Sequence, residues 1–224
     1  MENSMKDLNQ LLLQFDLKQN YKNEDFYVNK SNFFAFNLID KWPKWEKNIL
    51  NIYGEKYCGK THLSNIFKKK YKAFKIRANE FNSNNLKEFK VFENLILEDF
   101  DESVDENLMY TLFNIADQDN KFILINSLIP INQLNFKLND FKSRAKNCLF
   151  AKIEKPDDEL IFAILLKNFS DRQITIEKKL IDFIIKHIDR SYGKIYEFIY
   201  KIDEISLIKK KSIDFKTIKE TLKV

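Results

Sequence analysis

The chain has 224 residues, of which 44% are hydrophobic and 32% are charged, and its formal net charge is +5. This balance is typical of a soluble globular protein with one ordinary domain, or one domain and a small lid. No apolar run reaches the roughly 18 residues that a membrane span needs, and two cysteines provide no disulfide framework. We therefore expect a cytoplasmic protein without a membrane partner, and the small positive charge favours a nucleic-acid partner only weakly.

The chain opens with a polar segment, residues 1–20, which we predict to be a flexible tail. Short apolar runs then alternate with amphipathic segments. Strands are predicted over 49–53, 71–76, 94–98, 122–126 and 149–153, with helices over 61–70 and 107–116 between them. This βαβ rhythm predicts an α/β fold over residues 21–155, an αβα sandwich with a parallel five-stranded sheet.

After Pro156 the pattern changes to apolar residues at three- and four-residue spacing. Pro156 followed by Asp157 and Asp158 is a good start for a helix. Helices are predicted over 157–168, 177–188 and 192–205. We therefore place a domain boundary near Lys155 and predict a C-terminal α-helical lid over 156–224.

The first predicted strand runs into a phosphate-binding P-loop, Gly54-Glu55-Lys56-Tyr57-Cys58-Gly59-Lys60-Thr61. Glycines let such a loop fold tightly, so that successive backbone N–H groups face the phosphates. Lys60 would reach the terminal phosphates, Thr61 would hold Mg²⁺, and the helix from His62 onward would offer its positive end. An accidental turn is the alternative. The motif predicts ATP or ADP with Mg²⁺ as cofactors.

An acidic pair follows a second apolar strand, in Leu95-Ile96-Leu97-Glu98-Asp99. A carboxylate after such a strand orders the Mg²⁺ shell, and its neighbour orients the attacking water. We therefore predict Glu98 and Asp99 as metal residues and Asp99 as a catalytic one. The alternative is a strand that ends in exposed acids.

Several segments together resemble the AAA+ module of the bacterial initiator DnaA. They are Phe26-Tyr27-Val28 with Lys30-Ser31-Asn32, the P-loop continued as Thr61-His62-Leu63, Asp140-Phe141-Lys142-Ser143-Arg144, and Lys155-Pro156-Asp157-Asp158. The resemblance covers roughly residues 24–222. It implies that Phe26 and Val28 border the adenine, that His62 extends the nucleotide site, and that Arg190 is the sensor II arginine of the lid.

Arg144 is the final residue of a segment that resembles box VII of this family, whose arginine reaches a neighbour's nucleotide. Arginine is scarce in a chain rich in lysine, and its planar fork suits phosphate contacts. The resemblance implies that Arg144 acts as a finger in trans. The alternatives are local ion pairs, with Asp140 or another acid for Arg144, and with Asp189 or Asp182 for Arg190.

The tail carries Gln10-Leu11-Leu12-Leu13-Gln14-Phe15, which fits Gln-x-x-Leu-x-Phe. This resembles the motif that docks proteins into the sliding clamp, the β subunit of DNA polymerase III, through Gln10, Leu13 and Phe15. A short helix packed on the body is the alternative. The chain ends where an initiator would continue into its helix-turn-helix domain, so we expect the AAA+ module alone. DNA would then be reached indirectly through the clamp, and homo-oligomers are conceivable.

The arrangement resembles the DnaA-related AAA+ regulators, which bind the clamp and stimulate hydrolysis of DnaA-bound ATP, a negative regulation of initiation. The sequence departs from the family at Glu98, where aspartate is usual, and at Leu128, where an acid is usual. Asn126 or Ser127 could orient water or phosphate, or bond the loop before Pro130. These departures suit a protein that needs a bound nucleotide more than it needs rapid hydrolysis. The rivals are an active ATPase, such as a helicase loader or remodelling factor, and a nucleotide-stabilised clamp adaptor.

Overall fold

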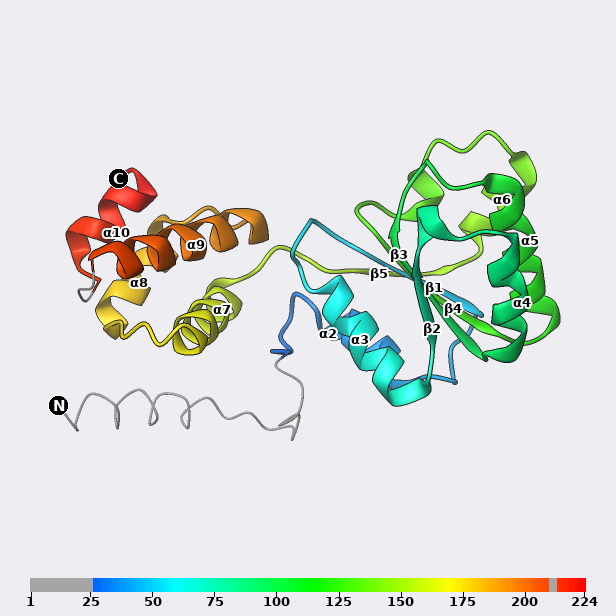
Figure 1. The fold of residues 1–224 in the computed structure, drawn as a ribbon, viewed down its shortest axis with the longest axis horizontal. Helices are drawn as coiled ribbons and strands as arrows, with labels where there is room; N and C mark the ends of the chain where they lie inside the picture. The colour runs from blue at the N-terminus through cyan, green and yellow to red at the C-terminus, as the bar shows by residue number, and fades with distance from the viewer. Residues whose placement is uncertain (1–25, 210–212) are drawn as a thin grey trace.

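The structure, a computed structural model, describes residues 26–209 and 213–224. The predicted tail and its clamp motif therefore lie outside the described residues. An α/β domain and a helical lid lie at opposite ends of the molecule, joined by the segment that follows the last strand (Figure 1). Within the described ranges, no helix combines the length and apolar character needed to cross a membrane.

Five parallel strands form one sheet in the order β2-β3-β4-β1-β5, which confirms the predicted parallel five-stranded sheet. The strands are β1 (Ile49–Tyr53), β2 (Phe74–Arg77), β3 (Asn94–Phe100), β4 (Phe122–Ser127) and β5 (Leu149–Lys152). The predicted start of β2 at Tyr71 is wrong. Tyr71 ends the preceding helix, and Lys72 adopts a left-handed φ of 50° that stops it.

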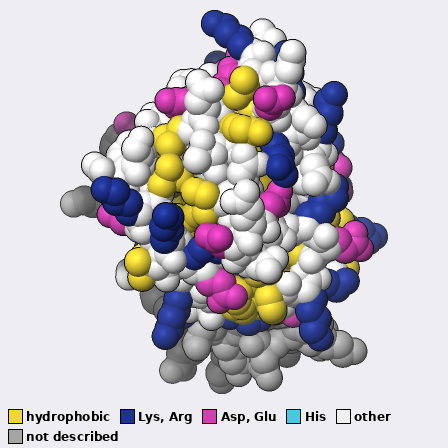
Figure 2. Space-filling model, turned by 90° about the vertical axis from the view of Figure 1, so that its right-hand side faces the viewer, with side chains coloured by type: hydrophobic (Ala, Val, Ile, Leu, Met, Phe, Trp, Pro, Cys, Tyr) yellow, Lys and Arg dark blue, Asp and Glu magenta, His cyan; other side chains and the backbone are white. Residues whose placement is uncertain are grey.

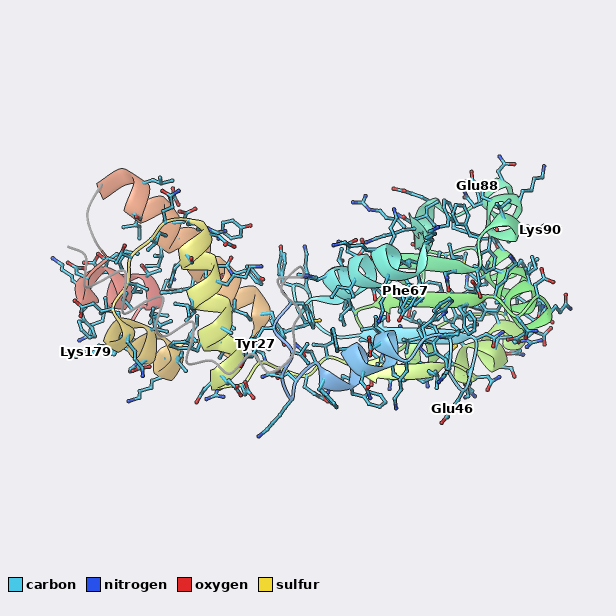
Figure 3. All side chains as sticks on the ribbon, turned by 90° about the horizontal axis from the view of Figure 1, so that it is seen from below. Tyr27, Glu46, Phe67, Glu88, Lys90 and Lys179 are labelled. Carbon is cyan, nitrogen blue, oxygen red and sulfur yellow. The ribbon has the colours of Figure 1, made fainter. Side chains whose placement is uncertain are left out.

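Helices cover both faces of the sheet because alternate strand residues point to opposite sides. The helices α2 (Phe33–Asp40) and α3 (Lys60–Tyr71) share one core with Ile96 and Leu124. The other face packs Leu95 and Ile123 against α4 (Ser83–Val91), α5 (Glu106–Gln118) and α6 (Asn139–Lys146). Phe67 of α3 is fully buried (Figure 3). The αβα sandwich therefore has two apolar layers.

The lid has its own apolar core, built from α7 (Asp158–Asp171), α8 (Lys178–His187), α9 (Tyr192–Lys209) and α10 (Phe215–Leu222). Asp157 caps α7 by accepting a hydrogen bond from the Leu160 backbone N–H at 2.9 Å. The helix α10 was not predicted from the sequence, and Asp214 caps it in the same way. Tyr27 lies at the junction of the two domains, where its hydroxyl donates to Glu159 at 2.7 Å (Figure 3).

Candidate nucleotide-binding site

The P-loop connects the carboxyl end of β1 to the start of α3, and both of its glycines are required by their surroundings. A Cβ on Gly54 would lie 2.9 Å from the Ile153 carbonyl oxygen, which is backbone. Gly59 has a φ of 101°, and a Cβ there would lie 2.9 Å from the Phe26 ring. The loop therefore folds tightly at the place where the sequence predicts a phosphate cradle.

Lys60 bonds the backbone of its own loop. Its ammonium donates to the carbonyl oxygens of Gly54 at 2.7 Å and Glu55 at 2.8 Å. The first turn of α3 has no side-chain cap, since its N-cap residue is Gly59. Uncapped N–H groups at a helix start bind anions well. Lys60 and the start of α3 thus offer positive charge to the same loop.

The remaining loop residues differ in exposure. Lys56 is exposed, with its ammonium 5.2 Å from the centre of the Tyr57 ring. Tyr57 has a left-handed φ of 70°, which costs an L-residue about 1–2 kcal/mol. Its ring lies 5.6 Å from that of Tyr196 in α9. Cys58 is buried, and burial raises the pKa of its thiol. The loop therefore contacts the lid as well as α3.

Glu98 lies at the centre of a buried polar cluster beside the P-loop. Its Oε2 accepts hydrogen bonds from Thr61 Oγ1 and Asn126 Nδ2, both at 3.0 Å. Its Oε1 lies 2.8 Å from the Lys75 ammonium. Burial opposes ionisation of Glu98, but the hydrogen bonds and charge of Lys75, with Asn126 and Ser64, hold its pKa below the usual value. The carboxylate is therefore charged at neutral pH.

The structure separates the two polar residues at the end of β4. Asn126 Nδ2 donates to Ser64 Oγ at 2.6 Å as well as to Glu98. Its buried Oδ1 accepts no hydrogen bond from the described residues. Ser127 instead donates to the Ile129 carbonyl oxygen at 2.6 Å, so it secures the loop before Pro130. Asn126 is thus the residue with an acceptor available for a water or ligand at the site.

The predicted metal residues are only partly brought together. Asp99 is exposed with a φ of 53°, at an irregularity in the pairing of β3 and β4, and its side chain bonds none of the described residues. Thr61 Oγ1 and Glu98 Oε2 are 3.0 Å apart. Adjacent oxygens on an octahedral Mg²⁺ at about 2.1 Å are also about 3.0 Å apart. Thr61 and Glu98 therefore fit Mg²⁺, which would neutralise phosphate charge, whereas the Asp99 side chain does not join their hydrogen bonds.

The residues predicted to border the adenine lie beside the loop. The Phe26 ring packs on Gly59 and lies 5.2 Å from the His62 ring and 6.2 Å from the Phe36 ring. Val28 is half-buried and packs against the same core. Phe26 and His62 together form an aromatic wall at the start of α3.

The lid is attached directly to the P-loop through Glu55. The Glu55 carboxylate accepts hydrogen bonds from the Tyr192 backbone N–H at 2.9 Å and from Ser191 Oγ at 3.2 Å, at the start of α9. The Tyr192 hydroxyl donates to the Glu154 carbonyl oxygen at 3.1 Å. Sequence reasoning placed Glu55 among the phosphate-binding residues and missed this contact.

Arg190 lies just before that contact. Its guanidinium pairs with Asp158 Oδ1 at 2.6 Å, with roughly half of the side chain exposed, rather than with Asp182 or Asp189. Because Ser191 touches Glu55, Arg190 stands next to the P-loop. An exposed ion pair of this kind is worth at most about 1 kcal/mol, so phosphate could displace Asp158.

Replacing Glu55 by alanine should loosen the lid. The first N–H of α9 would lose its acceptor, which costs about 1 kcal/mol. For a chain of this size that lowers the melting temperature by about 2–4 °C. Hydrogen exchange should rise in the first turn of α9. Glu154→Ala is the control, because the Glu154 side chain binds Lys152 and not the lid. Unchanged exchange in α9 of the Glu55 variant would show that the contact does not hold the lid.

Arg144 lies at the other end of the α/β domain. It sits in the last turn of α6, directly before β5, and its guanidinium pairs with Asp117 at the end of α5. The P-loop lies at the carboxyl ends of the parallel strands, so Arg144 is separated from it by the length of a strand. Five residues of β1 span about 17 Å. Arg144 therefore does not belong to the nucleotide site of its own chain.

Figure 2 looks at the end of the α/β domain farthest from the lid. Lysine and arginine side chains are interspersed there with acidic and hydrophobic ones. Over the described residues drawn in colour, this face lacks a broad patch of one charge. It therefore does not offer the continuous basic surface that tracks a nucleic-acid backbone.

Comparison with known proteins relates the chain to replication initiators. No protein-family model matches it. In sequence, it is 28% identical over 235 residues to the chromosomal replication initiator protein DnaA of Borrelia hermsii, covering 92% of this chain and 48% of that protein. The chain thus spans about half the length of the curated relatives that it matches.

Solved structures show the same fold. The chain matches domain III of the Thermotoga maritima initiator DnaA with a TM-score of 0.69 and 21% identity, over 89% of this chain and 94% of that one. It matches AMPPCP-bound DnaA from Aquifex aeolicus with a TM-score of 0.64 and 19% identity, over 84% and 66%. The chain is therefore similar in sequence to the replication initiator DnaA over most of its length and has the fold of DnaA domain III.

Proposed function

We propose that the chain binds ADP or ATP with Mg²⁺ at its P-loop and acts as an Hda-like negative regulator of replication initiation. In this role it docks on the β clamp and supplies an arginine that stimulates hydrolysis of DnaA-bound ATP. The observation that carries the proposal is the position of Arg144. It lies about a strand's length from its own P-loop, which supports a role of its guanidinium at a nucleotide held by another molecule.

The surroundings of Arg144 suit this role. Its side chain is 38% exposed, and its partner Asp117 is exposed to a similar extent. An exposed ion pair contributes little to stability, so the guanidinium can exchange Asp117 for a phosphate at small cost. A guanidinium at the transferring phosphoryl group neutralises charge that develops in the transition state. The chain would thus act on the nucleotide of DnaA while its own nucleotide orders the P-loop and lid.

The site of this chain itself supports retention of nucleotide more than turnover. Asp99, the residue expected to orient water, is exposed and takes no part in the hydrogen bonds around Glu98. The buried carboxylate of Glu98 is already paired with the Lys75 ammonium. An active ATPase remains the rival, favoured if the isolated protein hydrolyses ATP rapidly and Asp99→Asn abolishes that activity.

The central experiment combines the purified chain with DNA-loaded clamp and ATP-bound DnaA. Hydrolysis of the DnaA-bound ATP should accelerate only when chain, clamp and DNA are all present. Clamp binding without any acceleration would instead favour the rival in which the chain is a nucleotide-stabilised adaptor.

Substitutions in the tail test whether the chain docks on the clamp. Phe15→Ala and Leu13→Ala should each weaken binding to the purified clamp by about tenfold or more, because apolar anchors dominate such interfaces. Surface plasmon resonance would measure the affinity. Leu12→Ala is the matched control, since the motif Gln-x-x-Leu-x-Phe accepts any residue at that position. Equal affinity of the three variants for the clamp would refute the proposal that this motif docks on it.

A further inference from the structure

We infer that Lys75 is a built-in counter-cation for Glu98, which makes nucleotide binding by this chain nearly independent of Mg²⁺. The inference rests on the proposed binding of adenine nucleotide at the P-loop. It assigns a role to a residue that the P-loop motif does not include. Lys75 would be a positioning residue, because it acts on the nucleotide through Glu98.

The Lys75 ammonium lies at ion-pair distance from the carboxylate. Lys75 lies on β2, the edge strand beside β3, and its Nζ is 2.8 Å from Glu98 Oε1. The same ammonium donates to Asn65 Oδ1 on α3 at 2.7 Å. The Lys75 side chain is 17% exposed and that of Glu98 is 8% exposed, so solvent screens the pair little.

The pair changes what a phosphate meets on entering the site. Glu98 is linked through Thr61 to the start of α3, where the loop offers its N–H groups. An unpaired carboxylate there repels the phosphates, and Mg²⁺ ordinarily relieves that repulsion. In this chain Lys75 already neutralises the carboxylate. Metal-free nucleotide therefore meets a site without net negative charge.

The oxygen that faces the P-loop stays available to a metal. Glu98 Oε2 is the atom that meets Thr61 and Asn126, whereas Lys75 occupies Oε1. Mg²⁺ can thus approach Oε2 and Thr61 without displacing the ammonium. Because Glu98 carries one charge and Lys75 balances it, the attraction for Mg²⁺ is weakened rather than blocked.

Isothermal titration of ADP into the full chain, in excess Mg²⁺ and in EDTA, tests the inference. For the unaltered chain the two affinities should agree within about threefold. For Lys75→Met, the affinity in EDTA should fall by about tenfold or more while that in Mg²⁺ changes little, because an unpaired Glu98 then faces the phosphates. Lys70→Met is the matched control, since Lys70 lies on α3 but pairs with the exposed Asp40.

Further variants keep the test decisive. A second change, Glu98→Gln, in the Lys75→Met protein should restore equal affinities, because the repelling charge is gone. If Lys75→Met does not fold, Lys75→Gln, which keeps a donor for Glu98, should show the same metal dependence. A folded Lys75 variant that binds ADP equally well in both conditions would overturn the inference, as would an unaltered chain that needs Mg²⁺. Failure of the unaltered chain to bind ADP in either condition would instead refute the proposed function.

Discussion

Replacing Arg144 by alanine should lower the stimulated rate of DnaA-bound ATP hydrolysis by about 10³-fold, the usual effect of removing an arginine finger. The reason is electrostatic, since the guanidinium would neutralise the charge on the transferring phosphoryl. The fold should persist, because the variant loses only an exposed ion pair with Asp117. Release of phosphate from radiolabelled ATP on DnaA, with DNA-loaded clamp present, measures the effect.

Three further variants show whether the guanidinium itself matters. Arg144→Lys should recover little stimulation, because a point charge does not reproduce the planar fork. Asp117→Asn should keep or increase stimulation, since it frees the guanidinium. Arg77→Ala is the matched control, because Arg77 is exposed and ends β2, at the opposite edge of the sheet from β5. Full stimulation by Arg144→Ala would refute the trans mechanism while leaving nucleotide and clamp binding open.

The sheet and the P-loop could be predicted because their signals are local. Each strand is a short apolar run, and the loop is one continuous motif with Gly54 and Gly59 at the positions that need them. The limits of β2 were harder to predict, since Tyr71 and Ala73 suit a strand as well as a helix end. The left-handed turn at Lys72 decides between them and leaves no clear trace in the sequence.

The partners of the charged residues could not be predicted, because they come together only on folding. Glu55 meets Tyr192 across 137 positions, and Arg144 meets Asp117 across 27. Lys75 was missed for the same reason. A lysine within an apolar edge strand, next to a strand that ends in acids, was the available signal. It becomes specific only once the order of β2 and β3 is known.

Replacing Lys60 by alanine should weaken ADP binding by about 10–100-fold, because a charged hydrogen bond contributes about 1.5–3 kcal/mol. In the structure the Lys60 ammonium bonds two carbonyl oxygens of its own loop. A phosphate would take the place of these neutral acceptors with a charged one, and bonds to charged acceptors are the stronger. Isothermal titration of ADP measures the loss.

Lys56→Ala separates this effect from a general loss of positive charge. Lys56 belongs to the same loop, but its ammonium is exposed beside the Tyr57 ring, so the variant should bind ADP almost normally. Equal losses in both variants would mean that the loop attracts nucleotide only through diffuse charge. A loss confined to Lys60→Ala would mean that the ammonium leaves Gly54 and Glu55 for the phosphate. Glu55 would then lose the bond that its carbonyl oxygen accepts from Lys60. Because the Glu55 carboxylate binds α9, this loss would couple nucleotide binding to the position of the lid.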